Sequence, residues 1–326
     1  MKAIVSTKYG TPDILQLREV EKPAPGDDEV LVKIQAVSIN AMDWHRMRGK
    51  PFLFRIMLGF PKPKASILGA DIAGRVEAVG KNVTEFQPGD EVFGGVGQGG
   101  FAEYVAVRER ALLSKPANIS FEAAAAVPVA AVTALQALRD KGQLQPGQKV
   151  LINGASGGVG TFAVQLARSF GAEVTAVCST RNLAMAQAIG ADYVIDYTKE
   201  DFTRKGKQYD LILDVAASRS VSDYKRALSL QGICVVVGFS TTFHMLRSML
   251  MGSLASRTGS KKFVRFLAKL YPKDLVLLRE LLEAGKIVPV IDRCCPLSEV
   301  AEAMRYFGVE HARGKVVITV GPNNKA

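Results

Sequence analysis

The sequence predicts an α/β protein of two domains: a doubly wound parallel sheet and a mostly antiparallel β domain. Residues 149–238 alternate buried-type strands with helical segments, the order that builds a doubly wound parallel sheet. Residues 2–120 alternate short β-type runs with Gly, Pro and Asp turns, which is typical of antiparallel β structure. A chain of 326 residues is long enough for two such domains, each with its own core.

In the first part of the chain, β-type runs predict strands at residues 3–6, 29–38, 72–79, 91–94 and 101–107. The alanine-rich segment Phe121 to Leu138 contains Pro128, which predicts two helices that meet at a break between the domains.

In the second part, the pattern predicts strands at 149–153, 173–178, 193–196, 210–215 and 233–238, with helices at 159–170, 183–189 and 221–230. An apolar helix at 274–284 and a strand at 315–320 predict a return to the first domain. We therefore place the β domain at 1–122 and 270–326, and the parallel-sheet domain at 123–269.

Charge and composition leave several classes of partner open. A net charge of +11 fits a nucleic-acid binder, a protein at an anionic membrane or an enzyme for an anionic cofactor. The sequence has no basic motif studded with aromatic residues, so we do not expect nucleic acid. No apolar run approaches the length of a membrane span. Of the cysteines at 178, 234, 294 and 295 only the last two are close, and adjacent cysteines are poorly placed to bind one metal or close a disulfide, so we expect a reducing compartment and a cytoplasmic location.

A glycine-rich turn follows the predicted strand at 149–153 and opens directly into the next helix. Glycines allow a tight turn and let backbone amides approach a pyrophosphate, which then lies at the positive end of the helix dipole. Because the turn lies between a strand and a helix, it predicts a dinucleotide site rather than a simple turn. The residues that we expect to bind the cofactor here are Ala155, Ser156, Gly157, Gly158, Val159 and Gly160.

The end of the second strand of this domain indicates which dinucleotide is bound. An NAD site carries an Asp or Glu there for the ribose hydroxyls, whereas this chain has Ser179, Thr180 and Arg181. Hydroxyls and a guanidinium are donors that suit a 2′-phosphate, so we expect NADPH. Tyr197, just past the third strand, is expected to close over the same phosphate. The alternative is that Arg181 only begins a solvated helix.

This order of segments resembles the medium-chain dehydrogenase/reductase superfamily over nearly the whole chain, which implies a Rossmann domain and a GroES-like β domain. Zinc members of that superfamily carry a Cys near the position of Asn40, a Gly-His-Glu near 69–71 and a four-cysteine lobe near 95–115. This chain has Asn40, Gly69-Ala70-Asp71 and no cysteine between 95 and 110. The sequence therefore resembles the zinc-free quinone oxidoreductase and enone reductase branch, and we expect no metal.

The resemblance implies hydride transfer from NADPH to a quinone or an α,β-unsaturated carbonyl compound, with a small hydrophobic substrate. Such acceptors spread the charge that hydride delivers, so they need no Lewis acid. The resemblance also implies a homodimer paired near Phe263 to Leu267. It further implies cofactor contacts by Thr133, Val237, Gly238, Phe239 and Lys315.

Three residues are candidates for catalysis. Asn40 is expected to donate a hydrogen bond to the substrate oxygen, unless it only forms a turn. His45 titrates near neutral pH and is a candidate proton donor, although a lone histidine is more often structural. Asp43 is expected to orient its neighbours, and Asp71 to be structural.

Two basic and apolar segments keep further hypotheses open. Residues 44–70 hold six Lys or Arg and no acid, and residues 243–273 hold seven and no acid. They predict either a Met-rich wall over a hydrophobic cleft or a peripheral contact with an anionic membrane. The rival functions are a zinc-free alcohol or aldehyde dehydrogenase and a nucleotide-binding membrane adaptor with little catalysis.

Overall fold

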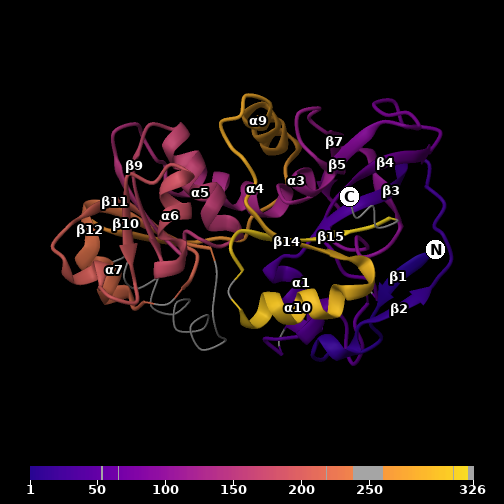
Figure 1. Cartoon of the computed structure of the whole chain (residues 1–326), viewed down its shortest axis with the longest axis horizontal. Coiled ribbons are helices and arrows are strands. Elements are labelled where there is room, and N and C mark those ends of the chain that lie inside the picture. The colour runs from indigo at the N-terminus through magenta and orange to yellow at the C-terminus, as the bar shows by residue number, and fades with distance from the viewer. Residues whose placement is uncertain (53, 65, 218, 238–259, 311, 322–326) are drawn as a thin grey trace. The chain divides into compact units, whose positions relative to one another are not determined.

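The computed structural model describes residues 1–326 except 53, 65, 218, 238–259, 311 and 322–326 (Figure 1). They form two compact units. The first unit comprises Met1–Ala130, Leu270–Gly285 and Pro289–Ala326, and the second comprises Ala131–Lys269 and Lys286–Val288. The boundary predicted after residue 122 falls inside helix α3 (Phe121–Ala125), which packs on strands of the first unit.

The first unit is built on a mostly antiparallel sheet with the strand order β14-β15-β3-β4-β5-β7, and β6 pairs with β3. β14 and β15 run parallel, and the other pairs are antiparallel. A separate antiparallel pair joins β1 to β2. The strands of this unit are β1 (Lys2–Val5), β2 (Gln16–Glu19), β3 (Glu29–Ser38), β4 (Asp71–Val79), β5 (Glu91–Gly95), β6 (Tyr104–Arg108), β7 (Leu112–Ser114), β14 (Ile291–Pro296) and β15 (Lys315–Thr319).

Helices pack around this sheet and complete its core. The predicted return of the chain to this unit occurs, because β15 pairs with β3. Ile34, Ile72 and Ile318 are almost fully buried in one hydrophobic cluster of this unit. Besides α3, its helices are α1 (Ala41–Arg48), α2 (Phe54–Leu58), α9 (Pro272–Glu283), α10 (Val300–Val309) and the short η1 (Pro12–Ile14), η2 (Glu109–Ala111) and η6 (Leu297–Glu299).

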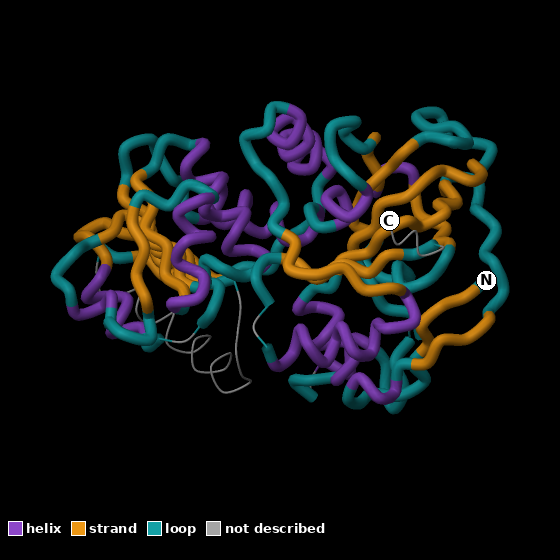
Figure 2. The backbone as a smooth tube through the Cα atoms, in the orientation of Figure 1, coloured by secondary structure: helices purple, strands orange, loops and turns teal. Residues whose placement is uncertain are grey.

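The second unit holds a six-stranded parallel sheet with the order β10-β9-β8-β11-β12-β13 (Figure 2). Counted from β8, this is the 3-2-1-4-5-6 order of the Rossmann fold, and the order reverses between β8 and β11. Ligands of such sheets bind outside the carboxyl ends of the strands at this point. The strands are β8 (Lys149–Asn153), β9 (Glu173–Cys178), β10 (Tyr193–Asp196), β11 (Tyr209–Asp214), β12 (Leu228–Val236) and β13 (Lys262–Arg265).

Helices cover the parallel sheet, so its strands are apolar on both faces. In β8, Val150, Leu151 and Ile152 are fully buried. The helices of this unit are α5 (Gly158–Ser169), α6 (Leu183–Ala188), α7 (Val221–Ala227) and the short η3 (Ala137–Lys141), η4 (Thr180–Asn182) and η5 (Phe202–Arg204). Helix α4 (Pro128–Gln136) begins in the first unit and continues into the second.

The prediction of two helices around Pro128 is confirmed by α3 and α4. The helix predicted at 221–230 is three residues too long. Leu228 takes an extended conformation and begins β12, where it pairs with Tyr209. Most of the basic segment at 243–273 lies outside the described residues.

A close contact between α1 and α10 generates a stability prediction. A Cβ atom added at Gly308 would lie 2.2 Å from the Cη2 atom of the Trp44 ring. We expect Gly308→Ala to lower the free energy of unfolding by about 1–2 kcal/mol, because overpacking outweighs the better helix propensity of alanine. Urea unfolding followed by circular dichroism measures the change.

The matched control is the same substitution in a Trp44→Leu background. If the indole ring is the obstacle, the cost of Gly308→Ala disappears there, and the double-mutant cycle shows a coupling between the two positions. An equal cost in both backgrounds would refute the contact.

Candidate functional site

The glycine-rich turn of the second unit follows β8 directly. Gly154 has a φ of +86°, a conformation that favours glycine. The backbone N–H groups of Gly154 and Ala155 donate to the carbonyl of Val177 at 3.2 and 3.1 Å, which fastens the turn to the end of β9. A Cβ atom at Gly160 would lie 2.1 Å from the carbonyl oxygen of Gly154, so only glycine fits there.

This turn leads into α5, and Gly157 is the residue that precedes the first helical residue. All six residues predicted for the phosphate site, 155–160, therefore lie in the turn or in the first turn of the helix. The first backbone N–H groups of any helix have no partner within it, and they carry the positive end of the helix dipole. The geometry suits the pyrophosphate of a dinucleotide.

A buried hydrogen-bond network supports the turn from the adjacent strand, and the sequence interpretation missed it. Asp214, at the end of β11, is 1% exposed and accepts hydrogen bonds from Asn153 Nδ2 at 2.9 Å and from the N–H of Ala217 at 2.9 Å. The Tyr224 hydroxyl also donates to Asp214. Burial raises the pKa of the Asp214 carboxyl, and these three donors oppose that rise. The network holds Asn153 immediately before Gly154.

The residues predicted to select the cofactor gather at the ends of β9 and β10. Arg181 is exposed and Ser179 is half-buried, and the N–H of Tyr197 donates to the carbonyl of Cys178 at 3.1 Å. Tyr197 is therefore brought beside Ser179, although the two are far apart in the sequence. The side chain of Tyr197 is 52% exposed.

Thr180 differs from its neighbours because its hydroxyl is already used. It donates to Asp196, the last residue of β10, which also accepts from the Thr198 hydroxyl at 2.7 Å. The Thr180 hydrogen bond is the largest of the effects that lower the pKa of Asp196. A phosphate contact by Thr180 would compete with this bond. Asp196 was not singled out in the sequence because its own segment gives no sign that it lies next to β9.

The other residues predicted to contact the cofactor are only partly described. Val237 follows β12, and its N–H donates to the carbonyl of Asp214 at 3.1 Å, so it lies at the same edge as the glycine-rich turn. Thr133 is half-buried in α4. Gly238 and Phe239 lie outside the described residues.

The first unit contains a second cluster, built around the buried ammonium of Lys315. Lys315 is 3% exposed, and its Nζ donates to Asn40 Oδ1 at 2.6 Å and to the carbonyl of Ile39 at 3.0 Å. Asn40 Nδ2 in turn donates to Asp71 Oδ2 at 2.9 Å and to the carbonyl of Ser38 at 3.3 Å. The amide of Asn40 is thus engaged on both sides, and donation of a hydrogen bond to substrate would require its bond to Asp71 or Ser38 to break.

Two buried carboxylates complete this cluster. Asp71 accepts from the N–H of Val129, near the start of α4, at 3.1 Å. Asp43 accepts from the N–H of Asn40 at 2.9 Å and from that of Gly69 at 3.1 Å. Burial raises the pKa of each carboxyl to about 6, and Lys315 opposes the rise. Burial lowers the pKa of Lys315, and the two carboxylates oppose that shift.

His45 lies in α1, two residues after Asp43, and is half-buried. Burial lowers the pKa of its imidazole from the ordinary value, which favours the neutral ring. A neutral ring is a weaker proton source than an imidazolium ion.

The residues at the positions of zinc ligands do not fit a zinc ion. Asn40 accepts from the Lys315 ammonium and donates to Asp71, so a positive charge is already present in this cluster. Among the described residues, no group of three or more His, Cys, Asp or Glu side chains is placed to hold a metal. We derive no chemical step through a metal.

Within the described part of the chain, no helix has both the length and the apolar character that crossing a membrane requires. In the basic segment at 44–70, the side chains of Phe52, Ile56 and Phe60 are 62%, 68% and 68% exposed. Their exposure leaves both hypotheses for this segment, a substrate wall and a membrane contact, as predictions.

Two family models match separate stretches of the chain. Residues 26–117 match the alcohol dehydrogenase GroES-like domain model, and residues 189–318 match the zinc-binding dehydrogenase model. The fold also resembles the crystal structure of an NAD-dependent alcohol dehydrogenase, with a TM-score of 0.87 and 30% identity over 98% of this chain and 100% of that one.

Two curated relatives cover nearly the whole chain. The quinone-oxidoreductase QR1, chloroplastic, of Triphysaria versicolor is 36% identical over 98% of both chains. The NADPH-dependent alkenal/one oxidoreductase, chloroplastic, of Arabidopsis thaliana is 32% identical over 98% of this chain and 79% of its own.

These relatives correct one expectation and establish the family. The prediction of a cytoplasmic location is wrong, because the relatives that state a location are chloroplastic or mitochondrial. It rested on cysteine spacing, which reports redox conditions and not the compartment. The extent of the similarity, together with the parallel sheet and the GroES-like sheet, shows that the chain belongs to the quinone-oxidoreductase-like branch of the medium-chain dehydrogenase/reductase family.

Proposed function

We propose that the protein is an NADPH-dependent reductase that transfers hydride to quinones or α,β-unsaturated carbonyl compounds without a metal. The observation that carries this proposal is the glycine-rich turn, which leads from β8 into α5 where the strand order reverses. The names of the two relatives, a quinone oxidoreductase and an alkenal/one oxidoreductase, support these substrate classes.

In this proposal the second unit binds the nucleotide. The amides at the start of α5 bind the pyrophosphate, and Ser179 with Arg181 binds the 2′-phosphate. Bound NADPH supplies the hydride. Tyr197, Thr133 and the chain around Val237 help to position the two ends of the cofactor. Thr180 has a supporting role, because its bond to Asp196 holds the turn in place.

The acceptor is expected to be able to spread negative charge over its own atoms. Hydride added to an enone gives an enolate, and hydride added to a quinone gives a hydroquinone anion. An unactivated ketone gives a localised alkoxide that needs strong stabilisation. Lys315 is a cation of the first unit, but its ammonium is buried and already donates to Asn40 and Ile39. We therefore do not assign it the stabilisation of an alkoxide.

The polar cluster of the first unit then has a positioning role. Lys315 and Asp71 hold the Asn40 amide, and Asp43 fixes the backbone at Asn40 and Gly69. Asn40 acts on substrate only if it exchanges one of these bonds. The sequence predicts that Lys315 contacts the cofactor. We propose instead that it acts indirectly, by holding the Asn40 amide. His45 remains a candidate for delivering a proton through water.

The edge of the parallel sheet suggests how two copies pair. β13 bonds to β12 on one side, and among the described strands it has no neighbour on the other. An unpaired edge is a template for a second chain. This edge supports the prediction of a homodimer paired near Phe263 to Leu267.

The first test is NADPH oxidation, with NADH in parallel, in the presence of a naphthoquinone and separately of a medium-chain enone. We expect turnover with NADPH on at least one acceptor and little oxidation of a simple alcohol. Alcohol oxidation with NAD would favour the alternative function of an alcohol dehydrogenase. The similar structure of an NAD-dependent alcohol dehydrogenase is the reason to include this assay. Tight NADPH binding without turnover would favour the adaptor.

The second test addresses the 2′-phosphate. Arg181→Gln removes a charge-assisted contact, so we expect KM for NADPH to rise roughly 10- to 100-fold while KM for NADH changes little. The matched control is Arg168→Gln, which removes the same charge from an exposed ion pair with Asp192. Equal effects of the two substitutions, or equal losses with NADH, would contradict a specific phosphate contact.

The third test addresses the buried ammonium. The pKa values of the Asp43 and Asp71 carboxyls are both raised to about 6 in the folded protein. The folded state therefore holds protons that the unfolded state releases. As a result, these two groups favour folding most at low pH. Lys315→Met raises both values further. We therefore expect it to cost about 3–5 kcal/mol at pH 8 and at least about 1 kcal/mol less at pH 5.5.

Urea unfolding at the two pH values measures this difference. Lys149→Met, at an exposed lysine in β8, is the control and should change stability by no more than about 0.5 kcal/mol at either pH. A cost of Lys315→Met that is the same at both pH values would show that the carboxylates are not compensated by this ammonium.

A further inference from the structure

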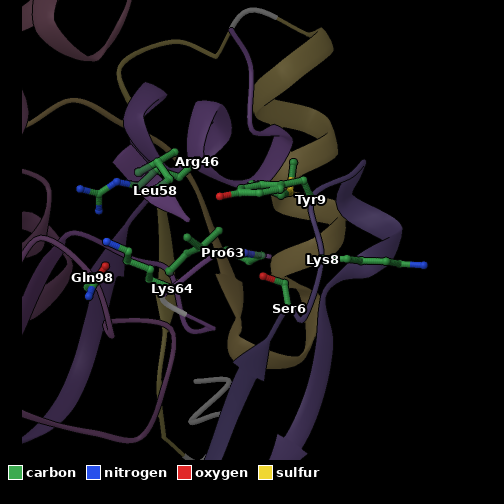
Figure 3. A pocket seen from close by; sticks show the side chains of 10 residues that line it. Ser6, Lys8, Tyr9, Arg46, Leu58, Pro63, Lys64 and Gln98 are labelled. Carbon is green, nitrogen blue, oxygen red and sulfur yellow. The ribbon is translucent and has the colours of Figure 1, made fainter. Parts of the chain in front are cut away.

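The first unit contains a small cavity with a cationic rim, formed largely by the basic segment 44–70, to which the function proposed above assigns no chemical step. It has a volume of about 250 Å³ and lies between the chain after β1, helix α1 and the segment after α2 (Figure 3). Lys8, Arg46 and Lys64 line it, and none of its lining residues is acidic. Known ligand pockets span about 300–1,000 Å³, so this cavity suits a small molecule.

One polar side chain of the cavity lining carries a hydroxyl. Ser6 is 3% exposed, and its described hydrogen bond is made by its backbone N–H, which donates to the carbonyl of Ser66 at 2.8 Å. In Figure 3 this hydroxyl points into the cavity. A hydroxyl can both donate and accept a hydrogen bond, so it is a suitable polar contact for a ligand or a water in the cavity.

The cations divide into two kinds. The Arg46 and Lys64 side chains extend toward the same side in Figure 3, whereas that of Lys8 extends away from the cavity. Arg46 donates to the carbonyl of Gly97, which fixes its guanidinium and leaves other N–H groups to bind an anion. Arg46 and Lys64 are thus the pair suited to one negative group.

Tyr9 and Gln98 add two more polar side chains to the lining, and the remaining residues are apolar. Met47 is 1% exposed and Leu68 is 5% exposed, and Leu58 and Pro63 add to the same wall. A ligand that matches all these features has a carboxylate at one end and a short apolar chain. An inorganic anion would leave the apolar wall unused, and a neutral chain would leave the cations unused.

We propose that this cavity binds a small aliphatic carboxylic acid, with its carboxylate at Arg46 and Lys64, its chain on Met47 and Leu68, and the Ser6 hydroxyl as a further polar contact. The binding needs no nucleotide and involves no residue of the buried Lys315 cluster. The binding can therefore be tested independently of the reductase function.

The test is titration calorimetry of the full-length, cofactor-free protein with hexanoate, 1-hexanol, acetate and inorganic phosphate. We expect saturable hexanoate binding, with each of the other three at least about tenfold weaker. No saturation by about 10 mM hexanoate, a concentration well above a millimolar Kd, would overturn the proposal. So would phosphate or hexanol binding as tightly as hexanoate.

Variants assign the contacts. Lys64→Gln changes an exposed side chain, so it should not affect folding, and we expect it to weaken hexanoate binding roughly tenfold. Ser6→Ala is expected to weaken it about threefold. Lys8→Gln is the matched control and should leave the affinity within about twofold, because an exposed charge directed away contributes little. Equal losses for Lys8→Gln and Lys64→Gln would show only a general effect of charge.

Discussion

The buried ammonium of Lys315 is the constraint on which the first unit depends. A lysine that is 3% exposed is tolerated only when oxygen atoms surround it, and these come from distant parts of the chain. Asn40 and Ile39 follow β3, Asp71 begins β4, and Lys315 itself begins β15. The three strands are neighbours in one sheet, in the order β15-β3-β4. Correct pairing of these strands and satisfaction of the buried charge therefore require each other.

The second unit also has carboxylates held by hydrogen bonds, at the carboxyl edge of its sheet. Asp214 and Asp196 end two of the parallel strands, and each carboxylate is held by hydroxyl and amide donors. Asp214 stabilises the chain just before the glycine-rich turn, and Asp196 stabilises the turn that carries Ser179 and Arg181. The hydrogen bonds to Asp196 lower its pKa and favour its charged form, so a phosphate near Ser179 depends on cations such as Arg181.

Much of this arrangement could be predicted from the sequence because it is local. The strand at 29–38, the strand at 149–153 and the break at Pro128 are each visible in a few adjacent residues, as is the turn that ends at Gly160. The commitment of the Asn40 amide could not be predicted, because its partner Lys315 is 275 positions away. The phosphate contact expected of Thr180 has the same weakness, because its hydroxyl donates to Asp196, which belongs to another strand. The start of β12 at Leu228 was missed because an apolar end of a helix resembles an apolar start of a strand.

The same cluster bears on what the first unit can do chemically. A catalytic zinc ion keeps an open position toward the substrate, and this is how it stabilises a developing oxyanion. The Lys315 ammonium lacks such a position, because it is enclosed and directs hydrogen bonds to Asn40 and Ile39. It supplies a buried positive charge without the open coordination position of a metal. A site of this kind favours acceptors whose own conjugation carries the charge, and that is the property that quinones and enones share.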